Sequence, residues 1–359
     1  MIHFHPLTVK KVVRETDDCV SVTFDVPAEL QEIFRFRAGQ NLTFKKILNG
    51  EELRRNYSLC SSPLDGTLRV AVKKVEGGVF SSWANEELKA GDVLESLPPT
   101  GKFCIDLDAA HQKHYVFFAA GSGITPVLSL LKTILASEPK SRCTLVYGNR
   151  SKTSIIFKEE LEALKDKHID RFRLYHVLSR EKTDVVLNYG RIDRDKCALL
   201  FDKVIDLASC DDFFVCGPEE MIFCVRDYLQ EAGIAPKKIH FELFTVPGQK
   251  KSNVETEKQE VSDSGPRAEV QVKLDGIAFD FALAYDGHSI LDAALKQGAD
   301  LPYACKGGVC CTCKAKLLEG EVEMDENWGL EPDEVAAGFI LTCQSHPRSG
   351  RVVVDFDAK

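Results

Sequence analysis

The chain has 359 residues and a net charge of −9, and 44% of its residues are hydrophobic against 28% charged. This length exceeds what one hydrophobic core usually organises, so we expect two or three globular domains. No stretch approaches the roughly 18 apolar residues of a membrane span, and the N-terminus lacks the apolar block of a signal peptide. We therefore expect a soluble, cytosolic protein that does not contact membranes.

The negative charge belongs to the C-terminal segment. Residues 268–359 contain 8 Lys and Arg against 16 Asp and Glu, so this segment carries −8 and all preceding residues together carry −1. An acidic surface of this kind can steer a basic protein partner and repels nucleic acid. The alternative is a surface that only solvates the segment.

Residues 1–108 alternate short β-branched segments with turns, such as SVTFDV, NLTFKKI, RNYSLC and TLRVAVKKV. Strands at this spacing are typical of an antiparallel β-barrel. One helix is expected near SSWANEELKAG. The first domain is therefore predicted to be an antiparallel barrel.

Two motifs in this domain have residues suited to phosphates and flat rings. The first is R-x-Y-S, with Arg55, Tyr57 and Ser58. The Arg55 guanidinium can bind a phosphate, and the Tyr57 ring offers an apolar face with a polar hydroxyl group at its tip. The second is EGGVFSSW at the start of the predicted helix, where free N–H groups suit a pyrophosphate; its residues are Gly78, Ser81 and Ser82. An edge strand and a capped helix are the alternatives.

Residues 109–245 alternate apolar strands with helices, as in HYVFFAA, PVLSLLKTILAS and CTLVYG. This alternation is typical of a parallel, doubly wound α/β sheet. After the first strand, AAGSGITP places Gly121 and Gly123 in a tight turn that opens a helix. Pro126 stands where the ordinary dinucleotide fingerprint has its last glycine, and proline is well placed in a first helical turn.

The next strand ends in VYGNRSKT. At this point NAD-specific sites place an acidic residue that holds the ribose 2′-hydroxyl, whereas this chain has Arg150, Ser151 and Lys152. Positive charge suits a 2′-phosphate, so we expect NADPH rather than NADH. A solvated basic turn is the alternative.

Residues 246–267 are rich in Lys, Glu, Ser and Gln and contain no aromatic residue, which predicts a flexible linker. The segment 268–359 follows. It begins with a β-hairpin that is expected to turn at Asp275 and Gly276, and continues with a helix in SILDAALKQGADLPY.

Four cysteines in nine residues, CKGGVCCTC, come after that helix. Cys305, Cys310 and Cys313 have the C-x4-C-x2-C spacing of plant-type [2Fe–2S] ferredoxins, which use a fourth cysteine further along the chain. Cys343 is the only cysteine left downstream. Cys311 is interpreted as a bystander, because its spacing fits no such pattern.

Zinc and disulfides are the alternatives for these cysteines. Zinc ligands usually come as two close pairs, whereas here three cysteines are bunched and one is remote. A cytosolic chain keeps its thiols reduced, which argues against a disulfide framework. Gly307 and Gly308 lie where a cluster loop needs unusual φ and ψ to point N–H groups at sulfur. A [2Fe–2S] cluster is therefore the favoured interpretation.

Together these motifs resemble the ferredoxin–NADP reductase superfamily, in the domain order of the reductase components of bacterial multicomponent oxygenases that carry a C-terminal ferredoxin. The resemblance extends to PPTGKF and FVCGPEEM and leaves only the linker uncovered. It implies a flavin-binding barrel (1–108), a nicotinamide-binding α/β domain (109–245) and an α+β plant-type ferredoxin domain of the β-grasp type (268–359). It also implies FAD, with FMN as the alternative.

The resemblance assigns roles to individual residues. It implies that Arg55 contacts a flavin phosphate, that Tyr57 lies against the isoalloxazine and that Ser58 offers its hydroxyl near N5. It places Cys216 beside the nicotinamide and Phe244 over the flavin face, so Ser58, Cys216 and Phe244 are the catalytic candidates. The implied pyrophosphate and nucleotide contacts are Gly78, Ser81, Ser82, Gly121, Gly123, Thr125, Pro126, Arg150, Ser151, Gly217 and Pro218.

The expected function follows from electron counting. Hydride brings two electrons, a [2Fe–2S] cluster accepts one at a time, and flavin can stand between them. We therefore expect electrons to pass from NADPH through FAD and the cluster to an oxygenase protein. A stand-alone NAD(P)H quinone or flavin reductase and a redox sensor are the alternatives.

Overall fold

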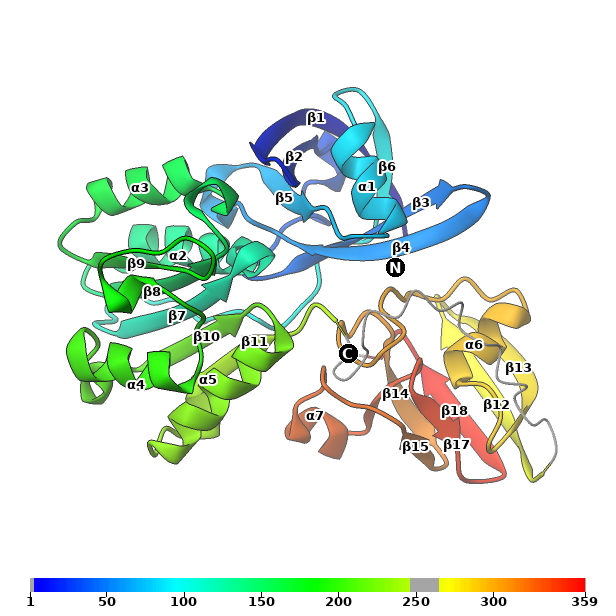
Figure 1. The fold of residues 1–359 in the computed structure, drawn as a ribbon. Coiled ribbons are helices and arrows are strands. Elements are labelled where there is room, and N and C mark those ends of the chain that lie inside the picture. The colour runs from blue at the N-terminus through cyan, green and yellow to red at the C-terminus, as the bar shows by residue number, and fades with distance from the viewer. Residues whose placement is uncertain (1–2, 246–264, 359) are drawn as a thin grey trace. The chain divides into compact units, whose positions relative to one another are not determined.

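The computed structural model describes residues 3–245 and 265–358. These form two compact units (Figure 1). One contains most of the barrel and the α/β domain, as His5–Leu53 and Tyr57–Leu243, and the other contains the C-terminal domain together with Arg54–Asn56 and Phe244. All but the last three residues of the predicted linker 246–267 lie outside the described residues, and Arg267 already begins a strand. Within the two described ranges, no helix combines the length and hydropathy that crossing a membrane requires.

The first domain is a six-stranded antiparallel sheet in the order β4-β3-β6-β1-β2-β5. Its strands are β1 (His5–Thr16), β2 (Cys19–Asp25), β3 (Asn41–Leu48), β4 (Glu51–Ser58), β5 (Leu68–Lys73) and β6 (Val93–Ser96). Just beyond β4, Leu59 bridges to Val70 of β5, which joins the two edges of the sheet. The predicted antiparallel barrel is confirmed, and the predicted helix is α1 (Val79–Glu86).

The second domain is a sheet of five parallel strands in the order β11-β10-β7-β8-β9. The strands are β7 (His114–Ala120), β8 (Arg142–Asn149), β9 (Phe172–Leu178), β10 (Asp212–Cys216) and β11 (Ile239–Glu242). Helices α2 (Ile124–Ser137) and α3 (Lys158–Lys167) cover one face, and α4 (Arg194–Lys203) and α5 (Glu219–Glu231) cover the other (Figure 1). The predicted doubly wound sheet is confirmed.

The strands of this sheet are apolar because both of their faces are covered. From His114 to Ala119 every residue of β7 is buried. Phe117 of β7 stacks on Phe214 of β10 with ring centroids 5.3 Å apart. The strand order reverses between β7 and β10, and ligands of open α/β sheets bind at such a switch point.

The C-terminal domain is a five-stranded mixed sheet in the order β13-β12-β18-β14-β16, in which β12 and β18 are parallel. Its strands are β12 (Arg267–Leu274), β13 (Ile277–Ala284), β14 (Lys314–Glu319), β16 (Phe339–Leu341) and β18 (Arg351–Asp355); β15 (Val322–Met324) pairs with β17 (Ser345–Pro347), and the helices are α6 (Ile290–Lys296) and α7 (Pro332–Ala336). The hairpin turns as predicted, with φ of 53° at Asp275 and 74° at Gly276. The Ser289 hydroxyl caps α6, accepting the Asp292 N–H.

The loops that follow β7 and β10 pack backbone against backbone at the switch point. A Cβ on Gly123 would lie 2.1 Å from the carbonyl oxygen of Cys216, and a Cβ on Gly217 would lie 2.6 Å from Cε of Met221. Only glycine permits this approach at position 123, where the neighbouring atoms are backbone, whereas at position 217 the Met221 side chain could move aside. The two loops therefore form one continuous edge beside the carboxyl ends of the central strands.

Gly123→Ala is expected to destabilise the α/β domain by about 1–3 kcal/mol, because the added methyl group has no room. Urea unfolding followed by circular dichroism measures this. Gly350→Ala is the control, since a Cβ there would meet nothing within 4 Å, and its effect should stay within about 0.5 kcal/mol. Equal stability of the two variants would contradict the close packing of these loops.

Candidate functional site

A hydroxyl and a carboxyl group connect the barrel to the α/β sheet. Ser58, the last residue of β4, donates its hydroxyl proton to Oε2 of Glu242, the last residue of β11, at 2.9 Å. Ser58 is only 4% exposed, and the Asn41 side chain also hydrogen-bonds the Glu242 carboxyl group. The structure thus gives the predicted residue Ser58 an acidic partner that the sequence analysis missed.

Burial raises the pKa of Glu242 to about 7, and the hydrogen bonds from Ser58 and Asn41 only partly oppose this. The residue keeps some exposed surface, but its carboxyl group is enclosed. A carboxyl group with a pKa near neutrality can hold or release a proton at physiological pH. The pair can therefore hold a proton at Oγ of Ser58 or at the carboxyl group of Glu242.

The other flavin candidates lie on β4 and at the start of α1. The Tyr57 ring stacks on Phe80 of α1 with centroids 5.6 Å apart, and Arg55 is exposed. The Ser81 hydroxyl accepts the Val75 N–H at 3.1 Å and donates to the Gly78 carbonyl at 3.2 Å. That hydroxyl therefore stabilises the turn into the helix.

The start of α1 fits an anion through its backbone. Gly78 is the N-cap residue, and the Ser82 N–H closes the first helical turn onto its carbonyl oxygen. The N–H groups before Ser82 have no partner within a regular helix, and such groups bind phosphates well. This turn fits the pyrophosphate of a flavin dinucleotide.

The nicotinamide candidates gather at the switch point. Thr125 is buried and donates its hydroxyl proton to the Ser122 carbonyl at 2.9 Å, and Pro126 follows it in the first turn of α2. Cys216 ends β10 and is fully buried, and burial raises the pKa of its thiol well above the usual range. Cys216 is therefore a neutral thiol, which offers packing and polarisability rather than a thiolate nucleophile.

The basic turn after β8 has an acidic neighbour. Lys152 lies 3.2 Å from the Glu181 carboxylate through its ammonium group, and its N–H donates to the same carboxylate at 2.8 Å. Arg150 is exposed, and its carbonyl oxygen accepts the N–H of Arg180 at 2.8 Å. The sequence analysis missed Arg180, which lies two residues after β9 in LSRE and is exposed. Its backbone joins the turn to the end of β9.

Ser151 and Phe244 are the remaining predicted residues. The Ser151 hydroxyl is 3.1 Å from that of Thr153. Phe244 is 43% exposed and belongs to the other compact unit. Its predicted position over the flavin therefore stays a prediction.

The four predicted cluster ligands lie as two pairs. Cys305 hydrogen-bonds with Cys310, and Cys313 with Cys343. Two thiol pairs fit the two irons of a [2Fe–2S] rhomb, with two ligands for each iron. Zinc needs about four donors around one point, and within the described ranges no group of three or more His, Cys, Asp or Glu side chains could hold a metal ion in this way.

Backbone N–H groups point at the sulfurs of these pairs. The hydrogen bond with Cys310 lowers the pKa of Cys305, and the N–H groups of Gly307, Val309 and Cys310 add to the effect. The hydrogen bond with Cys313 lowers the pKa of Cys343, helped by the Gly308 N–H. Such donors stabilise thiolates, which are the form that ligates iron.

The conformation of the loop corrects one expectation. Gly308 takes a positive φ of 75°, as predicted, and a Cβ there would lie 2.8 Å from the Glu326 carbonyl. The other positive φ values belong to Lys306 and Cys311, at 51° and 55°, and not to Gly307. Gly307 instead serves through its N–H, which lies 3.3 Å from the Cys305 sulfur. The prediction for Gly307 was wrong because surrounding contacts, and not residue type alone, select the φ values.

Cys311 differs from the other cysteines of the loop in its hydrogen bonding. Its thiol donates to the Gly329 carbonyl at 2.9 Å. A side chain engaged in this way is oriented by the segment that contains Gly329. The geometry agrees with its interpretation as a bystander.

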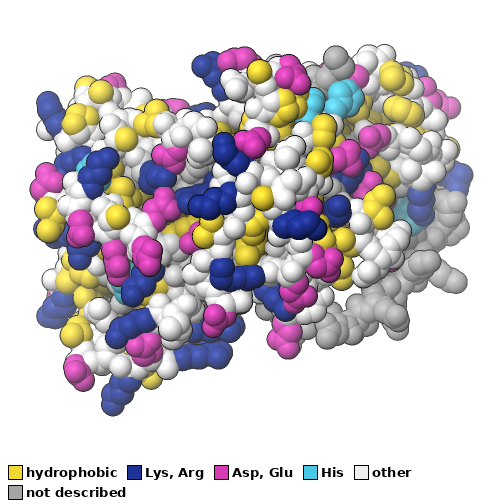
Figure 2. All heavy atoms as spheres, turned by 90° about the horizontal axis from the view of Figure 1, so that it is seen from above, with side chains coloured by type: hydrophobic (Ala, Val, Ile, Leu, Met, Phe, Trp, Pro, Cys, Tyr) yellow, Lys and Arg dark blue, Asp and Glu magenta, His cyan; other side chains and the backbone are white. Residues whose placement is uncertain are grey.

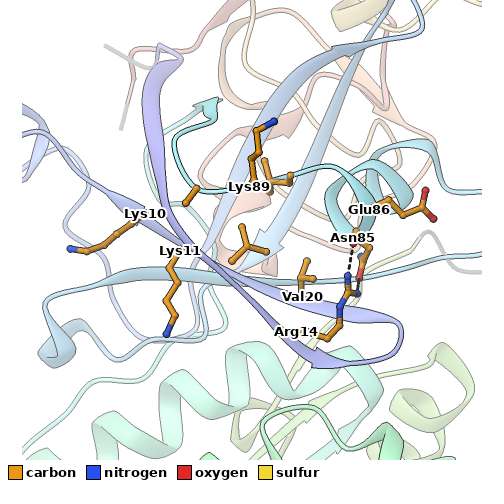
Figure 3. A pocket seen from close by; sticks show the side chains of 10 residues that line it. Lys10, Lys11, Arg14, Val20, Asn85, Glu86 and Lys89 are labelled. Atoms are coloured by element: carbon orange, nitrogen blue, oxygen red, sulfur yellow. Dashed lines mark hydrogen bonds between the residues drawn. The ribbon is translucent and has the colours of Figure 1, made fainter.

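A hollow of about 450 Å³ lies beside β1 and the end of α1, away from these groups. It is lined in part by Lys10, Lys11, Arg14 and Lys89. Figure 3 shows that the three lysine side chains point in different directions, while Arg14 is held by Asn85. On the face drawn in Figure 2, basic and acidic side chains are intermixed. This hollow therefore lacks converging donors for an anion.

Three family models match the chain. A model described as an oxidoreductase FAD-binding domain matches residues 6–105, one described as an oxidoreductase NAD-binding domain matches residues 117–227, and one described as a 2Fe-2S iron-sulfur cluster binding domain matches residues 272–348. Together they cover most of the chain, in the order expected from the sequence.

Curated relatives and solved structures agree with these matches. The chain is 48% identical to one of the subunits of 1,2-phenylacetyl-CoA epoxidase of Escherichia coli, covering 100% of this chain and 99% of that protein. It is 34% identical to the ferredoxin reductase component of 3-ketosteroid-9-alpha-monooxygenase of Rhodococcus rhodochrous, covering 98% and 96%. Its fold resembles that of phthalate dioxygenase reductase, with a TM-score of 0.60 over 98% of both chains at 24% identity.

Glu242→Gln is expected to remove a pH-dependent loss of stability. The unfolded chain releases this proton near its ordinary pKa of 4.5, whereas the folded protein releases it near pH 7. Between these values the folded state binds more protons, so the contribution of Glu242 to stability falls as the pH rises and levels off above about pH 7. Between pH 4.5 and pH 8, the free energy of unfolding of the variant should therefore rise relative to that of the wild type by on the order of 3 kcal/mol.

Urea unfolding of both proteins at several pH values measures this gain. A stability difference between variant and wild type that is the same at pH 5 and pH 8 would show that Glu242 ionises normally in the folded protein.

Proposed function

The chain belongs to the ferredoxin–NADP reductase superfamily, among the oxygenase reductases that combine FAD-binding, NAD-binding and [2Fe–2S] domains, and we propose that it supplies electrons from NADPH to the oxygenase of a phenylacetyl-CoA epoxidase. The proposal is carried by the presence of all three sites in one chain. Its 48% identity to a component of such an epoxidase supports the choice of oxygenase. The segments CKGGVCCTC and VEGGVFSSWAN also look most like the reductase component of that system.

We propose that the barrel holds FAD through the side chain of Arg55, the ring of Tyr57 and the turn formed by Gly78, Ser81 and Ser82. FAD, when bound, accepts a hydride and releases its electrons singly. Ser58 and Glu242 hold a proton beside it. By resemblance to the superfamily, Phe244 would cover the flavin face.

The nicotinamide nucleotide binds along the carboxyl edge of the parallel sheet. Thr125 and Cys216 line the place of the nicotinamide ring. The backbone of the two glycine loops approaches the rest of the nucleotide, through Gly121, Gly123, Pro126, Gly217 and Pro218. Arg150 and Ser151 contact the 2′-phosphate, and Arg180 adds a second guanidinium to the same phosphate.

Cys305, Cys310, Cys313 and Cys343 would hold the cluster as two thiol pairs. When bound, the cluster would supply one-electron transfer to the oxygenase protein. The acidic charge of residues 268–359 steers this domain toward a basic surface on that partner. The segment 246–267 acts as the linker between the domains 109–245 and 268–359, and residues 1–108 form the flavin domain.

The cytoplasm is the proposed location. All 13 cysteines fall within the described ranges, and none of them forms a disulfide there. Reducing compartments preserve such thiols.

Cys310→Ser tests the function directly. We expect the variant to lose the cluster, to keep FAD and NADPH-dependent ferricyanide reduction, and to lose at least about 90% of electron delivery to the oxygenase, because ferricyanide can take electrons from flavin while the oxygenase depends on iron. Iron analysis, flavin absorbance and oxygenase-coupled turnover measure these three properties.

Cys311→Ser is the matched control, since Ser can keep the hydrogen bond to the Gly329 carbonyl. It should retain iron and electron delivery. Unchanged physiological activity in Cys310→Ser would favour a stand-alone quinone or flavin reductase and defeat the proposal.

Arg150→Ala should lower kcat/KM for NADPH about tenfold or more, because a charge-assisted contact to phosphate is worth about 1.5–3 kcal/mol. The value for NADH should change little, since NADH has no 2′-phosphate, and it serves as the internal control. Steady-state kinetics with both coenzymes measures the effect. An equal loss for NADPH and NADH would show that Arg150 does not select the phosphate.

A further inference from the structure

Lys196 of α4 has a buried ammonium group that binds only backbone oxygens of one short segment. The residue is 6% exposed. Nζ donates to the carbonyl oxygens of Val186 at 2.6 Å, Leu187 at 3.1 Å and Tyr189 at 2.9 Å. An ammonium group has three donors, and all three are used here. Burying a cation is costly unless it is fully hydrogen-bonded, so this arrangement needs a reason.

The segment that Lys196 binds follows β9 at the carboxyl edge of the parallel sheet. Tyr189 forms a parallel bridge with Leu178, the last residue of β9, and the Gly190 N–H donates to the Leu178 carbonyl at 3.0 Å. Farther along, Ile192 covers Gly148 of β8, since a Cβ on Gly148 would lie 3.2 Å from Cδ1 of Ile192. The segment therefore runs past the ends of β9 and β8.

The contacts of the next residue link this segment to the switch point. The Arg191 guanidinium lies 3.7 Å from the carboxylate of Glu220, in the first turn of α5. That helix begins directly after Gly217 and Pro218, the loop that follows β10. Residues 186–192 thus extend along the edge at which the nucleotide binds in this class of sheet.

Burial of side chains does not hold residues 186–191 in place, since the first buried side chain along the segment is that of Ile192. Val186 is 74% exposed and Tyr189 is 44% exposed. The carbonyl oxygens turn inward to Lys196 while these apolar side chains face solvent. Tyr189 bridges to Leu178, two residues before Arg180, and the Arg180 N–H binds the Arg150 carbonyl. Exposed apolar side chains and arginines on neighbouring backbone segments suit a ligand that combines an aromatic ring with phosphate.

We propose that Lys196 is a positioning residue for the nicotinamide nucleotide. By binding three carbonyl oxygens it holds residues 186–191 along the edge of the sheet. Val186 and Tyr189 then form an apolar surface for the adenine ring near Arg150 and Arg180. The inference rests on the proposed function, because it requires a nucleotide at this edge. Lys196 itself does not touch the reacting atoms.

Lys196→Met tests the proposal, because Met keeps most of the aliphatic stem and lacks the three donors. We expect KM for NADPH and Kd for NADP⁺ each to rise about tenfold, with kcat within about twofold, because the loosened segment affects binding and not hydride transfer. Flavin and iron contents should match the wild type. Stopped-flow and steady-state kinetics and calorimetric titration of the holoenzyme with NADP⁺ provide these values.

Lys203→Met is the matched control, because Lys203 lies on the same helix, is exposed and pairs with Asp202. It should leave KM, Kd and kcat unchanged. A lower melting temperature of Lys196→Met with unchanged KM and Kd would show a merely structural role and overturn the proposal.

A second variant decides the question if Lys196→Met fails to fold. Tyr189→Ala keeps the carbonyl oxygen that Lys196 binds and removes the exposed ring, and it should raise Kd for NADP⁺ as well. In the wild type, NADP⁺ should slow hydrogen exchange of the amides in residues 187–190. Wild-type affinity in Tyr189→Ala together with unprotected amides would overturn the inference.

Failure of the proposed function gives a different result. If the wild-type holoenzyme neither oxidised NADPH nor bound NADP⁺, the proposed function would fail, and this inference with it. If the wild type does both while Lys196→Met and Tyr189→Ala bind NADP⁺ as it does, only the role of Lys196 is refuted.

Discussion

The hydrogen bond between Ser58 and Glu242 is the interaction at which the proposed flavin and nicotinamide sites meet. It joins the last residue of a barrel strand to the last residue of a strand in the parallel sheet, 184 positions later. Neither domain contains both groups, so the proton-holding pair exists only where the two domains meet. The enclosure that raises the pKa of Glu242 has the same origin.

A second constraint acts on the C-terminal domain. A cluster that takes one electron at a time needs thiolates, and thiolates inside a protein need hydrogen-bond donors. The loop supplies these by pointing N–H groups at Cys305 and Cys343. The strain of positive φ at Lys306 and Cys311 is the cost of this orientation. Binding of the cluster therefore depends on the whole loop and not only on the four ligand cysteines.

The sequence was most informative where a local pattern determines structure. Alternating β-branched residues predicted the barrel, the succession of strands and helices predicted the doubly wound sheet, and Asp275 with Gly276 predicted the hairpin turn. The spacing of Cys305, Cys310 and Cys313 predicted a cluster domain. Each of these signals lies within a short window of sequence, which explains why it can be read without a structure.

The features that were missed arise from contacts between distant segments. Glu242 ends a strand of only four residues, and nothing near it in sequence indicates that Ser58 is its partner. The roles proposed for Arg180 and Lys196 depend on the fold, because β8, β9 and α4 place their backbone beside one edge of the sheet. Gly307 was expected to take the strained backbone, but contacts of the folded loop shift that strain to Lys306 and Cys311. Such contacts leave no regular spacing in the sequence, and for this reason sequence analysis does not detect them.

The central claim is that this chain receives electrons in pairs and releases them one at a time. Anaerobic titration of the purified protein with NADPH, followed by its visible spectrum with flavin, iron and zinc measured in the same sample, tests it most directly. The account predicts about one FAD and about two irons per chain, with both chromophores bleaching as NADPH is added. A colourless protein, or zinc in place of iron, would contradict it.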